Sequence, residues 1–221
     1  MCIAAVVSPH AYITQDQWAN MVRLNPHGAG FSFVHPSTGQ IKIVKSMDGK
    51  ELFYKFERAI NSGANDHPML VHMRWATNGA KTTSNAHPFR IRNANASFVH
   101  NGIISQLADD ANVSDSMLFG KRVLSRLPKN WHKEDSIKLL LEDYIGKGNK
   151  VAALFGGSEP TYTILNEELG NWVDGVWFSN NSHTGFRSSS ARPSIKKKSK
   201  SANYLPKSSY RTPSFYERMG A

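Results

Sequence analysis

Short apolar segments lie near both ends of residues 1–186, with amphipathic segments between them, and this order is the feature that most constrains the fold. Runs rich in β-branched and aromatic residues, bounded by Gly, Pro or Asn, are typical of strands. Strands at both ends with helices between them predict an α+β domain built from stacked, mainly antiparallel sheets. The expected strands are 3–7, 31–35, 41–44, 69–75, 96–100, 151–155, 162–165 and 176–179.

Helix signals occur in the segments between these strands. Thr14 and Gln17 have the spacing of a capping box, in which each side chain accepts from the backbone N–H of the other residue. Ser114 is the expected N-cap of a later helix, and Gly146 is expected to end the last one. The expected helices are 15–22, 52–60, 115–127 and 137–145.

Positive charge is concentrated in the C-terminal residues. The net charge of the chain is +10, and residues 187–221 hold nine Lys or Arg against a single acid, Glu217. The same segment has nine serines and few aliphatic residues, so it cannot bury enough apolar surface to offset its ordering entropy. We therefore expect a globular domain over residues 1–186 and a basic, largely disordered tail over residues 187–221.

Cysteine usage and hydropathy indicate the compartment. The chain has one cysteine, which argues against a secreted domain held together by disulfides. The apolar run 2–7 is too short for the hydrophobic region of a signal peptide, and no run approaches the length of a membrane span. These features predict a cytoplasmic protein without membrane contact.

The single cysteine, Cys2, would become the N-terminal residue if Met1 were removed, which usually requires a small second residue. A thiol beside a free α-amine can act as a nucleophile with its own proton relay. Both groups titrate at about 8, so both protons are mobile near neutral pH. The alternative is a small residue buried at the start of the first strand, because free cysteine is among the most buried residue types. The position of Cys2 alone leaves both interpretations open.

Three further groups of polar residues occur far apart in the sequence. The first is His72-Met73-Arg74-Trp75-Ala76-Thr77-Asn78-Gly79, followed by His87-Pro88-Phe89; the second is His100-Asn101-Gly102; the third is Ser114-Asp115. Together with Cys2, they resemble in order and spacing the motifs of the class II, N-terminal-nucleophile glutamine amidotransferases. The resemblance extends over roughly the first 186 residues.

The resemblance implies a fold and a reaction. The fold is a four-layer αββα sandwich of the N-terminal-nucleophile hydrolase type. The reaction is hydrolysis of the glutamine side-chain amide to glutamate and ammonia, with no cofactor. This chain leaves no room for the synthase domain that commonly uses the ammonia, so the implied partner is a separate ammonia-accepting enzyme.

The resemblance also assigns the catalytic residues. Cys2 matches the nucleophile, and the Asn101 side chain and the Gly102 N–H match the oxyanion hole. Attack by a thiolate on an amide places negative charge on the carbonyl oxygen, and fixed N–H donors stabilise that charge. An Asn-Gly pair offers a side-chain amide beside an unobstructed backbone N–H. Read alone, the same pair is typical of a hairpin turn.

The substrate-binding residues follow from the same match. Arg74 matches the arginine that holds the α-carboxylate of the substrate, Asp115 the carboxylate that pairs with its α-ammonium, and Trp75 and Thr77 belong to the arginine motif. A free amino acid carries both charges at one end, so its recognition requires a cation and an anion. Arginine suits the carboxylate because its planar fork donates two parallel hydrogen bonds. Alternatively, Arg74 is a surface cation and Asp115 only favours a helix N-terminus.

Other functions remain open at this stage. The same fold could hydrolyse a γ-glutamyl compound or another small amide. A catalytically idle scaffold could instead bind nucleic acid or a protein partner weakly through the lysine-rich tail, since Lys and Arg neutralise phosphates. We assign no metal, because His72, His87 and His100 do not form a short-spaced ligand motif.

Overall fold

The computed structural model describes residues 2–76, 80–107 and 113–185. The described residues form a mixed α/β domain with two antiparallel sheets and four α-helices. The expected tail over 187–221 lies outside the described residues, so the expected domain division stays a prediction. The helices are α1 (Gln15–Leu24), α2 (Gly49–Asn61), α3 (Asp115–Arg122) and α4 (Asp135–Ile145).

The first sheet has six strands in the order β3-β2-β4-β1-β10-β9, and the second has four in the order β5-β6-β7-β8. Every neighbouring pair is antiparallel. The strands of the first sheet are β1 (Ile3–Val7), β2 (Ala29–Val34), β3 (Ile41–Ser46), β4 (Met69–Met73), β9 (Asn171–Val173) and β10 (Val176–Phe178). Those of the second are β5 (Phe89–Ile91), β6 (Ala96–Asn101), β7 (Lys150–Phe155) and β8 (Thr161–Leu165).

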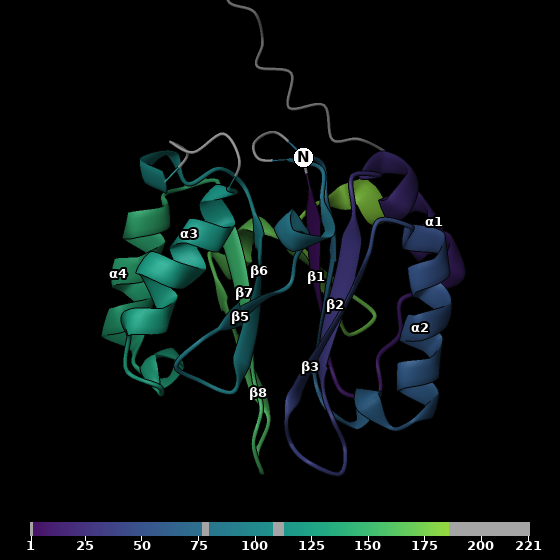
Figure 1. Cartoon of the computed structure of the whole chain (residues 1–221), viewed down its shortest axis with the longest axis horizontal. Helices are drawn as coiled ribbons and strands as arrows, with labels where there is room; N and C mark the ends of the chain where they lie inside the picture. The colour runs from purple at the N-terminus through teal and green to yellow at the C-terminus, as the bar shows by residue number, and fades with distance from the viewer. Residues whose placement is uncertain (1, 77–79, 108–112, 186–221) are drawn as a thin grey trace, which may run out of the picture. The chain divides into compact units, whose positions relative to one another are not determined.

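The two sheets face each other; α1 and α2 cover the outer side of the first sheet, and α3 and α4 cover the outer side of the second (Figure 1). In β1, Ile3, Ala5 and Val7 pack in the cluster beneath α1 and α2, whereas Ala4 and Val6 point toward the second sheet, as the two-residue period of a strand requires. This layering is compatible with the expected α+β sandwich. The buried apolar residues of the layer between the sheets are Ala4, Val6, Val34, Ile41, Leu70, Val99, Ala152, Leu154, Ile164 and Trp177.

Several expected elements are confirmed, and others differ in their bounds. Thr14 caps α1, where its Oγ1 accepts from Gln17 N at 3.2 Å and Gln17 Oε1 accepts from Thr14 N at 2.9 Å. The last helix ends before Gly146, as predicted. The helix expected over 115–127 ends at Arg122, and a separate 3-10 turn covers Leu124–Arg126. The expected strand 69–75 ends at Met73.

The edge strands β5 and β9 were not predicted from the sequence. Each has three residues, which is too short for a two-residue alternation to be recognised. Both lie at the outer edge of their sheets, where one side of the strand has no partner strand.

Polar contacts cross the gap between the sheets. Ser97 Oγ donates to Ser32 Oγ at 2.8 Å, and His72 Nε2 lies 3.0 Å from the carbonyl oxygen of His100. The His72 and His87 rings pack at 4.1 Å between centroids. Burial lowers the pKa of His72 to about 3, and burial also lowers the pKa of His87 and of His100. All three histidines are therefore neutral in the folded protein at neutral pH.

These histidines should make the protein sensitive to acid. Unfolding exposes imidazoles that titrate near pH 6.5, so below about pH 6.5 the unfolded chain binds protons that the folded chain does not. The free energy of unfolding should therefore decrease as the pH is lowered, by up to about 1.4 kcal/mol per pH unit for each buried histidine. His87→Phe removes one of these sites, and neither ring nitrogen of His87 has a hydrogen-bond partner among the described residues.

Urea denaturation between about pH 6.5 and pH 4.5 measures this slope. We expect His87→Phe to reduce the change in free energy of unfolding by about 1.4 kcal/mol per pH unit, which corresponds to one proton. His10→Asn is the matched control, because it replaces a histidine whose side chain is 76% exposed. A slope for His87→Phe equal to that of the wild type would contradict the prediction.

Candidate functional site

A pocket of about 270 Å³ forms where the start of β1, the end of β6 and the residue stretches following β4 and preceding β7 come together. It contains the one cysteine of the chain. Four of the seven residues predicted for the site are among its lining residues. The lining residues are Cys2, Trp75, Asn101, Gly102, Ile103, Gly148 and Asn149.

The Cys2 side chain lies against the backbone of Trp75. Trp75 N donates to Cys2 Sγ at 3.3 Å, and Sγ lies 3.4 Å from the carbonyl oxygen of Trp75. Burial raises the pKa of the Cys2 thiol, while the Trp75 N–H, the terminal amine of the chain and the Arg74 cation lower it. Desolvation therefore opposes the thiolate, and hydrogen bonding and nearby positive charge favour it.

Two residues that the sequence analysis missed hold this start of the chain. Asn180 Nδ2 donates to the Cys2 carbonyl oxygen at 2.6 Å. Ser179 Oγ accepts from Ala4 N at 2.9 Å and from Asn101 Nδ2 at 2.8 Å, so it links the first strand to the predicted oxyanion residue. Only the structure identifies them, because it pairs the strand that precedes them with β1.

Asn101 ends β6, and Gly102 continues with a φ of +148°, in a region that L side chains rarely adopt. A Cβ on Gly102 would overlap the Asn149 side chain and would lie 2.9 Å from the Asn149 Cα. The chain then runs to a 3-10 turn at Ser105–Leu107, so the hairpin-turn alternative for this pair is wrong. The Asn101 amide has two N–H groups. One donates to Ser179 Oγ, so the contact with Ser179 uses only one of the two donors.

Arg74 and Asp115 are buried and do not line the pocket. Arg74 Nη1 donates to the Ala80 carbonyl oxygen at 2.8 Å. Burial lowers the pKa of Arg74, and the charges of Cys2 and Asp115 raise it. The guanidinium therefore lies within electrostatic reach of both, and a surface cation at this position is excluded because Arg74 is 3% exposed.

The Asp115 carboxylate lies at the N-terminus of α3 and is held by backbone donors. Its Oδ2 accepts from Ile104 N at 2.7 Å, and its Oδ1 accepts from Ser116 N at 2.8 Å. Ile104 directly follows Ile103, which lines the pocket. Ser114 is the N-cap, as predicted, and its Oγ accepts from Met117 N at 3.2 Å.

The structure thus brings Cys2, Trp75, Asn101 and Gly102 to one pocket and leaves Arg74 and Asp115 buried outside its lining. Thr77 lies outside the described residues. The catalytic and substrate-binding roles expected for these residues stay predictions.

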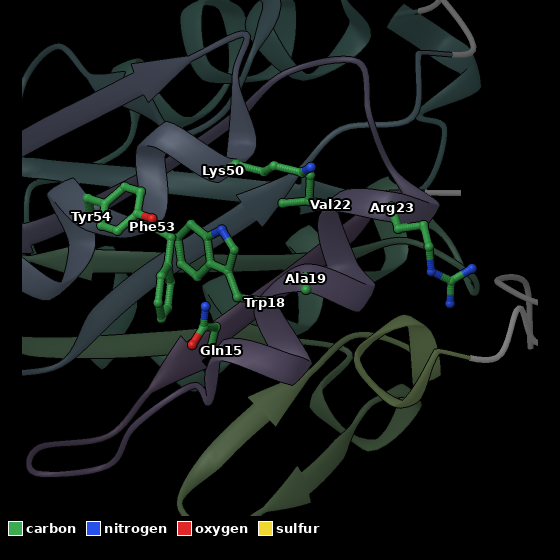
Figure 2. Close-up of a pocket in the computed structure, with 8 residues that line it drawn as sticks. All are labelled: Gln15, Trp18, Ala19, Val22, Arg23, Lys50, Phe53 and Tyr54. Carbon is green, nitrogen blue, oxygen red and sulfur yellow. The ribbon is translucent and has the colours of Figure 1, made fainter.

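A second pocket, of about 500 Å³, lies between α1 and α2 (Figure 2). Trp18 and Phe53 form its apolar wall, and Lys50 and Arg23 lie beside it. The Trp18 indole is already bonded, since Nε1 donates to the Gly49 carbonyl oxygen at 2.7 Å. No cysteine, histidine or carboxylate lines this pocket. The smaller pocket, which holds the thiol, is therefore the candidate site.

Within residues 2–76, 80–107 and 113–185, no group of three or more His, Cys, Asp or Glu side chains is arranged to hold a metal ion. None of the helices in these ranges has the length and apolar character needed to cross a membrane.

The electrostatic contact between Arg74 and Cys2 can be tested by alkylation, because Cys2 is the only thiol. Arg74→Gln removes a cation that lowers the pKa of the thiol, so less thiolate, the reacting form, is present at a given pH. We expect iodoacetamide to alkylate this variant several-fold more slowly at about pH 8, as followed by intact mass. Arg74→Lys keeps the charge and should react at nearly the wild-type rate. Equal rates for Arg74→Gln and wild type would show that the two groups do not interact.

Comparison with known proteins gives local similarity only. No protein-family model matches the chain. A stretch of 88 residues, 38% of the chain, is 31% identical to a glutamine–fructose-6-phosphate aminotransferase (isomerizing) of Gluconobacter oxydans and covers 13% of that enzyme. A stretch of 40 residues, 18% of the chain, is 50% identical to an enzyme of the same name from Corynebacterium glutamicum and covers 6% of it. The chain therefore matches only a small part of the length of these curated relatives.

Proposed function

We propose that this chain is a class II glutamine amidotransferase domain, which hydrolyses the side-chain amide of glutamine to glutamate and ammonia. The local similarity supports relationship to that domain family and nothing further of the two larger enzymes. The helix–sheet–sheet–helix layering agrees with an N-terminal-nucleophile hydrolase fold. The observation that carries the proposal is the pocket shared by Cys2, Asn101 and Gly102, residues far apart in sequence.

The reaction follows from the groups at this pocket. Once Met1 is removed, the α-amine of Cys2 takes the thiol proton, and the thiolate attacks the side-chain carbonyl carbon of glutamine. Negative charge develops on the carbonyl oxygen, where the Asn101 amide and the Gly102 N–H donate to it. One such donor typically contributes about 2.7–4 kcal/mol to the transition state.

The C–N bond then breaks, and the α-ammonium of Cys2 protonates the leaving ammonia. Glutamate is left as a thioester on Cys2, and water hydrolyses this ester to restore the thiol. The ammonia then passes to an acceptor enzyme.

The charged residues beside the pocket supply recognition of a free amino acid. Arg74 binds the α-carboxylate and Asp115 the α-ammonium, and Trp75 and Thr77 are the further substrate-binding residues. Burial strengthens both contacts, because charged hydrogen bonds gain strength where water is excluded. The alternatives drawn from the sequence are hydrolysis of another small amide and binding through the basic tail, which lies outside the described residues.

Removal of Met1 should be required for activity. Only protein that begins at Cys2 should release glutamate from glutamine, because a Met1 amide cannot relay the thiol proton. Fractions with and without Met1, distinguished by intact mass, should have the same thermal midpoint and differ in turnover by about 10³-fold or more. Processed Cys2→Ala is the matched inactive control. Full glutamate release from protein that retains Met1 would contradict the proposal.

Asn101→Ala should lower kcat by about 10²–10³-fold and change KM little, because its donor acts mainly on charge that develops in the transition state. The same substitution removes the contact of Asn101 with Ser179 Oγ. Ser179→Ala removes that contact, together with the contact from Ala4 N, but keeps the Asn101 amide, and is therefore the matched control. If both variants lose the same activity, the Asn101 side chain acts as a structural anchor and not as an oxyanion donor.

A further inference from the structure

His100 is 2% exposed and uses both ring nitrogens, although the mechanism above assigns it no role. Its Nδ1 lies 2.7 Å from Ser116 Oγ, and its Nε2 lies 2.9 Å from Asn149 Oδ1. Ser116 follows Asp115 in α3, and Asn149 lines the pocket that holds Cys2. One ring thus connects the two ends of the candidate site.

The hydrogen positions of this network follow from its partners. Asn149 Nδ2 donates to the Ile145 carbonyl oxygen at 2.6 Å, so the Asn149 oxygen faces His100 as an acceptor. His100 Nε2 therefore carries the hydrogen and donates. Burial lowers the pKa of His100, so the ring is neutral and has a single N–H. Its Nδ1 must then accept from the Ser116 hydroxyl.

On the pocket side, His100 fixes the Asn149 amide. That amide packs against Gly102 so closely that a Cβ on Gly102 would overlap it. Movement of the Asn149 side chain would therefore displace the Gly102 backbone, whose N–H is aimed at the oxyanion in the proposed reaction.

On the α3 side, His100 determines where the Ser116 hydroxyl points. Ser116 Oγ lies 3.3 Å from Asp115 Oδ1, farther than its 2.7 Å distance from His100 Nδ1. A hydroxyl has one hydrogen, so donation to His100 withholds it from the carboxylate. Asp115 Oδ1 then keeps acceptor capacity for an ammonium group.

We propose that His100 is a positioning residue that aligns Gly102 through Asn149 and keeps the Asp115 carboxylate available for an α-ammonium group through Ser116. This inference rests on the proposed function and deepens it. His100 thereby favours amides that carry an α-ammonium, because its contact with Ser116 leaves Asp115 Oδ1 available to bind that group.

Two substitutions of His100 separate its two contacts. His100→Gln places an amide near Nε2, which keeps a donor for Asn149 and loses Ser116. We expect the KM for glutamine to rise about three- to tenfold, which is the change typical for the loss of one hydrogen bond. The kcat should be nearly unchanged. His100→Asn places an amide near Nδ1, which keeps Ser116 and loses Asn149. In that variant kcat should fall by a similar factor, with KM nearly unchanged.

Rescue distinguishes positioning from a general loss of packing. In His100→Gln the Ser116 hydroxyl is free to donate to Asp115, so adding Ser116→Ala should return KM toward the wild-type value. Glutaramate, which is glutamine without its α-amine, should be hydrolysed equally well by wild type and His100→Gln. Failure of the rescue, an equal effect on glutaramate, or joint changes of kcat and KM in both variants would overturn the inference.

A measurement without substrate separates this inference from the proposed function. Nitrogen NMR of the wild-type protein should show the His100 hydrogen on Nε2, and a hydrogen on Nδ1 would overturn the inference. Glutamate release by the wild type together with failed rescue refutes only the role of His100. Absence of glutamate release by processed wild type refutes the proposed function, and the positioning role falls with it.

Discussion

The structure depends on the placement of β1 between β4 and β10 in the middle of the first sheet. Ile3 pairs with Met73 and Ala5 with Phe178, both in antiparallel register. Because antiparallel neighbours run in opposite directions, the start of β1 meets the ends of both partner strands. Those ends lead directly into Arg74 and Trp75 on one side and into Ser179 and Asn180 on the other.

Packing between the sheets then brings the end of β6 to the same place. Small and apolar side chains fill most of this layer, and polar contacts such as that of Ser97 with Ser32 join one sheet to the other. The contact from His72 to the His100 backbone fixes β6 beside β4 one residue before Asn101. A buried polar contact stabilises little on balance, yet it excludes alternative registers that would leave its groups unpaired. The position of the predicted oxyanion pair is thus a consequence of sheet packing.

Features that depend on local chemistry could be predicted from the sequence, whereas residues positioned by tertiary strand pairing could not. The capping box at Thr14 and the helix end at Gly146 are readable because their hydrogen bonds form within a few residues. The motif residues Cys2, Asn101 and Gly102 were predictable as a set from their order. Ser179 and Asn149 were not, since each acts only through a strand that neighbours it in space.

Ser179 illustrates how closely the parts of such a site are joined. Its hydroxyl oxygen has two lone pairs, and the Ala4 N–H and the Asn101 amide are directed at that one atom. The alignment of the first strand and the aim of the Asn101 amide are therefore not independent variables. During evolution, a substitution at this serine would have to preserve both contacts at once. A change in the position of either donor would have to be matched by a change in the other.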